Sequence, residues 1–132
     1  EAIFEALRER RCYATTGHRP LIDFSIDSYP MGSLVEVKSS NREILAERKI
    51  RATVKGTALI ERIEVIRNNT EVCTYRGESS DVAFEWNDQQ DLSYIALHRK
   101  VRGWAKTCYY YLRITQADGE MVWTSPIWFV VR

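Results

Sequence analysis

The chain has 132 residues, of which 45% are hydrophobic, and its 19 basic and 18 acidic residues give a net charge of +1. This length predicts a single domain with a packed core, whereas the near-zero net charge excludes the uniformly basic surface that binds nucleic acids or anionic membranes. No apolar run approaches the roughly 20 residues of a membrane helix, and no signal-peptide pattern is present. We therefore expect neither a nucleic acid nor a membrane as a partner.

Residues 1–11 form an amphipathic pattern that predicts a short α-helix. Ile3, Ala6 and Leu7 lie on one stripe, and acidic residues precede basic ones, as the helix dipole favours. The segment has no start methionine and no Ser, Thr, Asp or Asn as an N-cap, so we expect the natural chain to continue upstream. The compartment of the parent protein therefore stays unassigned.

The next segment changes to extended and turn chemistry over residues 12–20, where Gly17 tolerates a positive φ and Pro20 precedes a strand. Residues 21–27 alternate between apolar and polar side chains, which predicts a strand with Ile22, Phe24 and Ile26 facing inward. A turn is expected at residues 29–32. Residues 34–38 then follow as the predicted hairpin partner of that strand.

The middle of the chain continues with short strands separated by polar loops. Residues 39–43 are predicted as a loop, residues 49–55 and 61–67 as alternating strands, and residues 72–75 as a further strand. Asn68-Asn69-Thr70 suits a tight hairpin turn, because asparagine tolerates a left-handed backbone.

Residues 77–98 repeat the pattern of loop and strand. A loop at residues 77–80 precedes a strand in which Val82, Phe84 and Trp86 face inward. A polar turn is predicted at residues 87–90, and one more strand at residues 92–97. A basic, glycine-containing connection, residues 98–104, leads to the last part of the chain.

The last part, residues 106–131, predicts a hairpin around Asp118-Gly119, a pair that tolerates positive φ. The period of two residues separates the first strand into two faces, with Cys108, Tyr110, Leu112 and Ile114 on one and Tyr109, Tyr111, Arg113 and Thr115 on the other. Ser125-Pro126 interrupts the return strand, because proline cannot donate a hydrogen bond to a ladder. Residues 127–131 are therefore expected either to begin a new segment or to cross to a second sheet.

The recurrence of short strands about every ten residues predicts an all-β fold, an antiparallel immunoglobulin-like β-sandwich preceded by one short N-terminal α-helix. We expect residues 1–19 to be the terminal helix and linker of a preceding domain, and residues 20–132 to be the β-sandwich domain.

No arrangement of side chains predicts a catalytic or metal site in this chain. Cys12, Cys73 and Cys108 form no CxxC pair and have no histidine at metal-ligand spacing, so buried free thiols are expected. A disulfide between Cys73 and Cys108 is the alternative. His18 and His98 are expected to face solvent.

Two blocks of sequence resemble the C-terminal part of a large uncharacterised bacterial family, which is placed in the polymerase-and-histidinol-phosphatase superfamily of metal-dependent hydrolases. The resemblance covers nearly the whole chain except residues 91–105. The first block comprises residues 2–8, 13–17, Arg19 and 31–33; the second comprises residues 84–88, 110–119 and 125–128.

The resemblance implies a parent enzyme whose N-terminal αβ barrel holds divalent metals through histidine and carboxylate ligands. The metal is thus expected in the absent N-terminal domain, and no cofactor is expected in this fragment. In the family, one block links barrel to sandwich, which makes its residues candidates for an interface with the catalytic domain: Tyr13, Thr15, Thr16, Gly17 and Arg19. Structural roles in the linker are the alternative for the same residues.

The leading hypothesis is a noncatalytic accessory domain that packs against its own N-terminal catalytic domain and shapes its mouth or its contacts in a homo-oligomer. The fragment alone is expected to be inactive. A carbohydrate- or polymer-binding module is the alternative, with Tyr109, Tyr111 and Trp104 as an aromatic platform, although aromatic strand residues more often supply core. A third hypothesis makes the fragment itself an enzyme.

Overall fold

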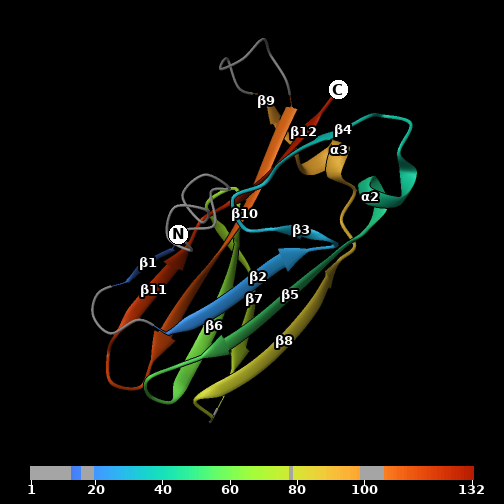
Figure 1. Cartoon of the computed structure of the whole chain (residues 1–132). Coiled ribbons are helices and arrows are strands. Elements are labelled where there is room, and N and C mark those ends of the chain that lie inside the picture. Colours follow the sequence, from blue (N-terminus) through green and yellow to red (C-terminus); the bar gives the residue numbers. More distant parts are fainter. Residues whose placement is uncertain (1–12, 16–19, 78, 99–105) are drawn as a thin grey trace.

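The computed structural model describes residues 13–15, 20–77, 79–98 and 106–132. Within these residues, strands form two layers that pack face to face (Figure 1), one sheet of eight strands and one of four. The predicted all-β sandwich is therefore confirmed. The predicted N-terminal helix lies outside the described residues.

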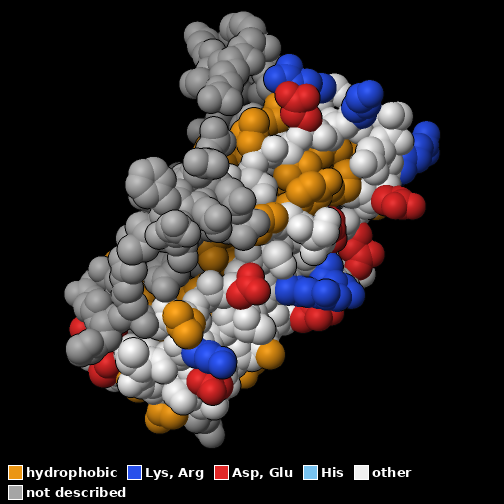
Figure 2. Space-filling view, viewed as in Figure 1, with side chains coloured by type: hydrophobic (Ala, Val, Ile, Leu, Met, Phe, Trp, Pro, Cys, Tyr) orange, Lys and Arg blue, Asp and Glu red, His pale blue; other side chains and the backbone are white. Residues whose placement is uncertain are grey.

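The four-stranded sheet, called sheet B here, is antiparallel and has the order β3-β2-β5-β8. Its strands are β2 (Leu21–Ile26), β3 (Tyr29–Pro30), β5 (Arg48–Lys55) and β8 (Asp81–Asp88). Its inward side chains are mostly apolar, whereas charged groups of both signs are mixed on the outward face of these strands (Figure 2). Glu85 lies 3.2 Å from Lys49 and 3.4 Å from Arg51 on this solvated face.

The eight-stranded sheet, called sheet A here, is organised around the long strand β10 (Lys106–Gln116). One side of β10 pairs with β6 (Ile60–Arg67) and with the short β9 (Leu97–His98); the other side pairs with β12 (Ile127–Val131) and β11 (Met121–Thr124). The outer strands are β7 (Thr70–Arg76), β4 (Leu34–Val37) and β1 (Tyr13–Thr15). Both halves of the return strand thus stay in sheet A, so Ser125-Pro126 begins a new segment and does not lead to the second sheet.

The chain path is that of an immunoglobulin-like sandwich. Strands β2, β5 and β8 form one layer, while β6, β7, β10 and β12 form the core of the other. The prediction that residues 34–38 return as a hairpin partner of residues 21–27 is wrong. Instead β4 crosses to sheet A and runs parallel to β12, the one parallel pair among the described strands. Gly32, with φ of 86° and an N–H that donates to the Pro126 carbonyl at 3.0 Å, directs the chain to that sheet.

Two short helices form where the sequence predicts a loop and a strand. Helix α2 (Arg42–Ala46) begins in the predicted loop at residues 39–43, and Asn41 caps it by accepting from the Ile44 N–H. Helix α3 (Leu92–Ile95), capped by Asp91, occupies most of the predicted strand at residues 92–97. Leu92 is fully buried while Tyr94 is 87% exposed, so one helical turn buries a single leucine and keeps its tyrosine in water.

The two tight hairpin turns lie where the sequence predicts them, whereas two other turns differ from their predicted bounds by one or two residues. Asn68 and Asn69 have φ of 51° and 67°, and Gly119 has φ of 91°, as tight turns require. The turn predicted at residues 29–32 is present in its second half, where Gly32 has φ of 86°, whereas Tyr29 and Pro30 form β3 after a separate turn at Asp27 with φ of 54°. The turn predicted at residues 87–90 begins later, because β8 continues to Asp88.

The core lies between the two sheets and consists mainly of aliphatic and aromatic side chains from β2, β5, β6, β8, β10 and β12. The predicted inward face of β10 is confirmed, since Cys108, Tyr110, Leu112 and Ile114 are all fully buried. Cys73 and Cys108 are both free thiols, as predicted, but only Cys108 is buried, because Cys73 has intermediate exposure. Cys12 and His18 lie outside the described residues.

Candidate functional site

Four polar side chains meet inside the sandwich. They lie at the end of the molecule where Figure 1 shows helices α2 and α3. Each sheet contributes one cross-strand pair: Arg48 lies opposite Asp88 in sheet B, and Arg67 lies opposite Tyr110 in sheet A. Arg48, Asp88 and Tyr110 are at most 1% exposed, and the Arg67 side chain is 17% exposed. We call these four residues the end cluster.

Arg48 holds the loops and helices at this end of the sandwich. Its Nη1 donates to the carbonyls of Ile44 at 2.8 Å and Leu45 at 2.9 Å, which are orphan acceptors of the last turn of α2. Its Nη2 donates to the Gln90 carbonyl at 2.5 Å and lies 3.5 Å from Asp88 Oδ2, while its Nε donates to the Tyr110 hydroxyl at 3.1 Å. A buried guanidinium with every nitrogen engaged has a structural role.

Asp88 is equally well satisfied. Its Oδ2 accepts from the Tyr110 hydroxyl at 2.5 Å and from Arg67 Nη1 at 2.6 Å, and its Oδ1 accepts from the Gln90 N–H at 3.1 Å. Burial disfavours the charged carboxylate, but the hydrogen bonds from Tyr110 and Arg67 outweigh it and lower the pKa of Asp88. Burial also raises the pKa of Tyr110, which keeps its phenol neutral. Asp88 is therefore an ionised anchor and has no proton to donate near neutral pH.

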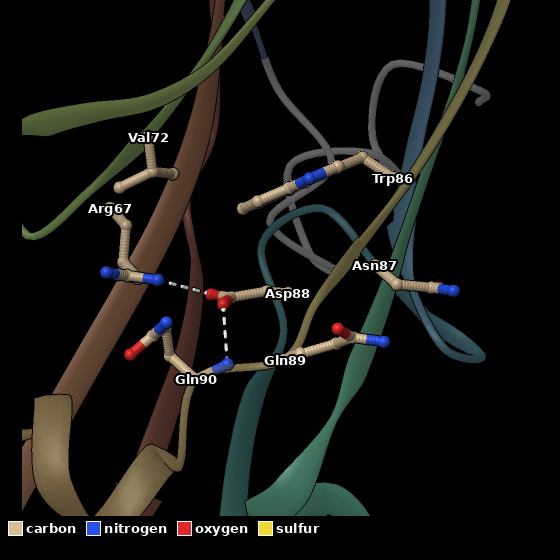
Figure 3. A pocket seen from close by; sticks show the side chains of 7 residues that line it. All are labelled: Arg67, Val72, Trp86, Asn87, Asp88, Gln89 and Gln90. Carbon is tan, nitrogen blue, oxygen red and sulfur yellow. Dashed lines mark hydrogen bonds and ion pairs between the residues drawn. The ribbon is translucent and has the colours of Figure 1, made fainter.

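A pocket of about 350 Å³ opens beside the end cluster. Its lining comes from both sheets and from the loop after β8: Arg67, Val72, Trp86, Asn87, Asp88, Gln89 and Gln90. Figure 3 shows the Trp86 indole extending toward Val72 above the ion pair between Arg67 and Asp88. Among the described residues that line the pocket, the ionisable ones are Arg67 and Asp88, and they are paired with each other.

The predicted aromatic platform lies on the outward face of sheet A. Tyr109 and Tyr111 have parallel rings with centroids 6.3 Å apart, and the Tyr109 ring is 4.8 Å from that of Trp128. Tyr109 is only 9% exposed and Tyr111 is half-buried, so the rings present less surface than a solvent-facing platform requires. Trp104 lies outside the described residues.

The predicted interface residues fall partly on β1. Tyr13 pairs with Thr124 and Thr15 pairs with Val122 of β11, so three residues of the predicted linker are hydrogen-bonded to sheet A. Thr16, Gly17 and Arg19 lie outside the described residues. The division of the chain at residue 19 stays a prediction.

Sequence reasoning missed Arg48, Arg67 and Asp88 as a group, although a signal was present. Arg48 continues the inward parity of Ile50, and Asp88 continues that of Trp86. Strand parity thus places each charge on an inward face, two positions beyond the last inward apolar residue of its strand.

Two further observations concern metals and membranes. Among the residues that the structure describes, no group of three or more His, Cys, Asp or Glu side chains is placed to hold a metal ion. Neither helix in the described part of the chain has the length and apolar character to span a bilayer.

Comparison with known proteins gives sequence relatives of unknown function. No protein-family model matches the chain. An uncharacterised protein of Chlamydia pneumoniae is 42% identical over 128 residues, and one of Chlamydia trachomatis serovar D is 39% identical over 129 residues. Each match covers 97% of this chain and 20% of the relative, so the chain spans about a fifth of the length of the curated relatives it matches.

Among solved structures, the crystal structure of a CARDB domain from Pyrococcus furiosus, in complex with di-metal ions, is similar to this chain. The match covers 88% of this chain and 96% of that domain, with 12% sequence identity and a TM-score of 0.39.

Proposed function

We propose that this chain is a noncatalytic accessory β-sandwich of a longer metal-dependent hydrolase of the polymerase-and-histidinol-phosphatase superfamily. In this proposal the domain follows the catalytic barrel, packs on it, and shapes its mouth or the contacts of a homo-oligomer. The two sequence blocks that resemble the family's C-terminal part are the basis of the assignment to that superfamily.

The observation that carries the noncatalytic role is the saturation of Asp88. The carboxylate beside the pocket accepts hydrogen bonds from Tyr110, Arg67 and the Gln90 backbone. Two guanidinium groups beside it repel a divalent cation, and three hydrogen bonds already occupy most of the acceptor sites of the carboxylate. The end cluster therefore does not fit a metal, and in this proposal the metal belongs to the barrel.

Two findings support a place in a larger protein. The relatives from Chlamydia are long enough to hold further domains, because this chain matches 20% of their length. The pairing of β1 with β11 ties the segment before the sandwich to sheet A, which would orient a preceding domain against that sheet.

The test compares the full-length parent, the parent without residues 1–132, and the 132-residue chain. Divalent metal is measured by inductively coupled plasma mass spectrometry, and activity by hydrolysis of p-nitrophenyl phosphate. We expect stoichiometric metal and activity in the parent, neither in the chain, and a lower melting temperature for the truncated parent. Metal and hydrolysis in the isolated chain, or neither in the parent, would refute the proposal.

The alternative, carbohydrate or polymer binding through Tyr109, Tyr111 and Trp104, has weaker support because Tyr109 is 9% exposed. A glycan array on the chain separates the two functions. Saturable binding that is lost in Tyr111→Ala but kept in Tyr94→Ala, a control at a tyrosine that is 87% exposed, would favour the alternative.

A further inference from the structure

We propose that the pocket beside the end cluster binds a small organic carboxylate, with Arg67 contacting the acid group and Trp86 and Val72 contacting a flat apolar body. The pocket's volume of about 350 Å³ lies within the range of small-molecule sites, roughly 300–1,000 Å³. It combines an apolar wall with a few convergent polar groups, as such sites do.

Charge makes the pocket selective for an anion. Two guanidinium groups, Arg48 and Arg67, face one carboxylate, Asp88. Arg48 has all its nitrogens engaged, and the nearby Asp91 is an exposed helix cap that bonds Ser93. Among the described residues, the side chain that accepts a hydrogen bond from Arg67 is Asp88, and the bond comes from Nη1 alone.

Arg67 therefore keeps donor capacity for a ligand. A guanidinium carries five N–H groups in a planar fork that matches a carboxylate. The side chain is 17% exposed, so it lines the pocket while most of its surface is shielded from water. An anion beside a partly desolvated charge is attracted more strongly than one at a fully solvated lysine or arginine.

The opposite wall favours a flat apolar group. The Trp86 indole is half-buried and points across the pocket toward Val72, which comes from the other sheet (Figure 3). The rim carries the exposed side-chain amide of Gln90, which extends toward Arg67 and can both donate and accept hydrogen bonds, whereas the side chains of Asn87 and Gln89 point away from Arg67 (Figure 3). A planar carboxylic acid with a further polar group can contact Arg67, the apolar wall and the polar rim at the same time.

The test uses sodium benzoate as the probe of the 132-residue chain, followed by NMR of the Trp86 indole N–H and the Arg67 Nε–H. We expect saturable shifts of both signals with a dissociation constant on the order of millimolar, as is usual for a ligand of so few atoms. Benzamide, the neutral isostere, should bind roughly tenfold more weakly, because it lacks the charge that Arg67 recognises. Inorganic phosphate tests whether charge alone is sufficient.

Variants separate the two contacts. Arg67→Met should weaken benzoate binding by roughly tenfold or more, whereas Arg51→Met, a matched change on the solvated outward face, should leave it unchanged. If Arg67→Met does not fold, Arg67→Lys retains a positive charge beside Asp88 and should still weaken binding, because a lysine lacks the planar fork. Trp86→Leu should weaken both benzoate and benzamide.

Several results would overturn the proposal. They are no saturable shift with benzoate, equal affinity for benzoate and benzamide, or benzoate binding that survives both Arg67 variants. Tighter binding of phosphate than of benzoate would also overturn it, because the apolar wall would then have no role.

Discussion

Replacing Asp88 with asparagine tests the end cluster directly, because the change keeps the size of the side chain and removes its charge. Asp88 Oδ2 accepts from Tyr110 and Arg67, and Oδ1 accepts from the Gln90 N–H. An asparagine offers one oxygen and one NH₂ group, so in either orientation a donor faces a donor. The variant therefore leaves two arginines without a carboxylate and one hydrogen bond unmade.

The magnitude follows from the burial of the group. Removing one partner of a buried ion pair costs about 3–5 kcal/mol, because the remaining charge stays in a poorly solvated site. Arg48 is fully buried, but Arg67 is 17% exposed and can recover some hydration. We therefore expect the free energy of unfolding to fall by about 3 kcal/mol, which lowers the melting temperature of a domain of this size by roughly 10 °C.

Urea denaturation followed by circular dichroism measures the change, with the slope of the transition as a check that the unfolded state is unaltered. Asp23→Asn is the matched control, because Asp23 is exposed on the outward face of β2. Its effect should stay within about 0.5 kcal/mol. An Asp88→Asn variant as stable as the control would contradict the role given to the end cluster.

The free energy of unfolding of Asp88→Asn and of the control Asp23→Asn, measured at decreasing pH, gives a second test. The pKa of Asp88 is lowered in the fold, because hydrogen bonds from Tyr110 and Arg67 outweigh the effect of burial. The unfolded chain then binds a proton before the folded chain does, so this contribution to stability is complete above about pH 4 and is lost as the pH falls further. Asp88→Asn should reduce this loss, whereas the contributions from Glu64, whose pKa Arg113 lowers, and from Asp91, whose pKa a hydrogen bond from Ser93 lowers, should remain.

Three further changes test other parts of the structure. Tyr110→Phe removes a hydroxyl that bonds both Arg48 and Asp88, so the free energy of unfolding should fall by about 1–3 kcal/mol in urea, and an unchanged value would contradict the bonded geometry. Cys108 is fully buried and burial raises its pKa to about 11, so a thiol reagent should leave it unlabelled in mass spectra until urea is added; labelling in the native chain would count against its burial. Asn69 has φ of 67°, so Asn69→Val should destabilise the fold by roughly 1–2 kcal/mol while Asn69→Gly should not; equal effects in thermal melts would argue against the left-handed turn.

Strand faces and hairpin turns could be predicted from the sequence, because both depend on residues that are close together in the chain. The alternation of residues 49–55 and 106–115 gave the inward side chains correctly, because successive side chains of a strand point to opposite faces whatever lies beside them. Asn68-Asn69 and Gly119 likewise take positive φ for reasons that lie in the turn itself.

The short helices and the pairing of strands were harder to predict from the sequence. The signal for a short helix is weak, and strand pairing depends on residues that are far apart in the chain. The caps Asn41 and Asp91 were visible in the sequence, but each precedes barely one helical turn, whose stability comes from burying Ile44, Leu45 or Leu92. The alternation in β4 is the same whether it pairs with β2 or with β12, so its sequence could not reveal the crossing.

Local sequence patterns were sufficient to predict the sandwich class and the faces of its main strands, and they place Arg48, Arg67, Asp88 and Tyr110 at inward positions. Their meeting depends on contacts between distant strands, because a buried charge needs a countercharge: Arg48 meets Asp88 across neighbouring strands of sheet B, and Arg67 reaches Asp88 from the facing sheet. The same long-range packing buried Tyr109 on an outward face and set the pocket beside Arg67. Local alternation fixes where a side chain points, and the contacts between distant strands fix what it meets there.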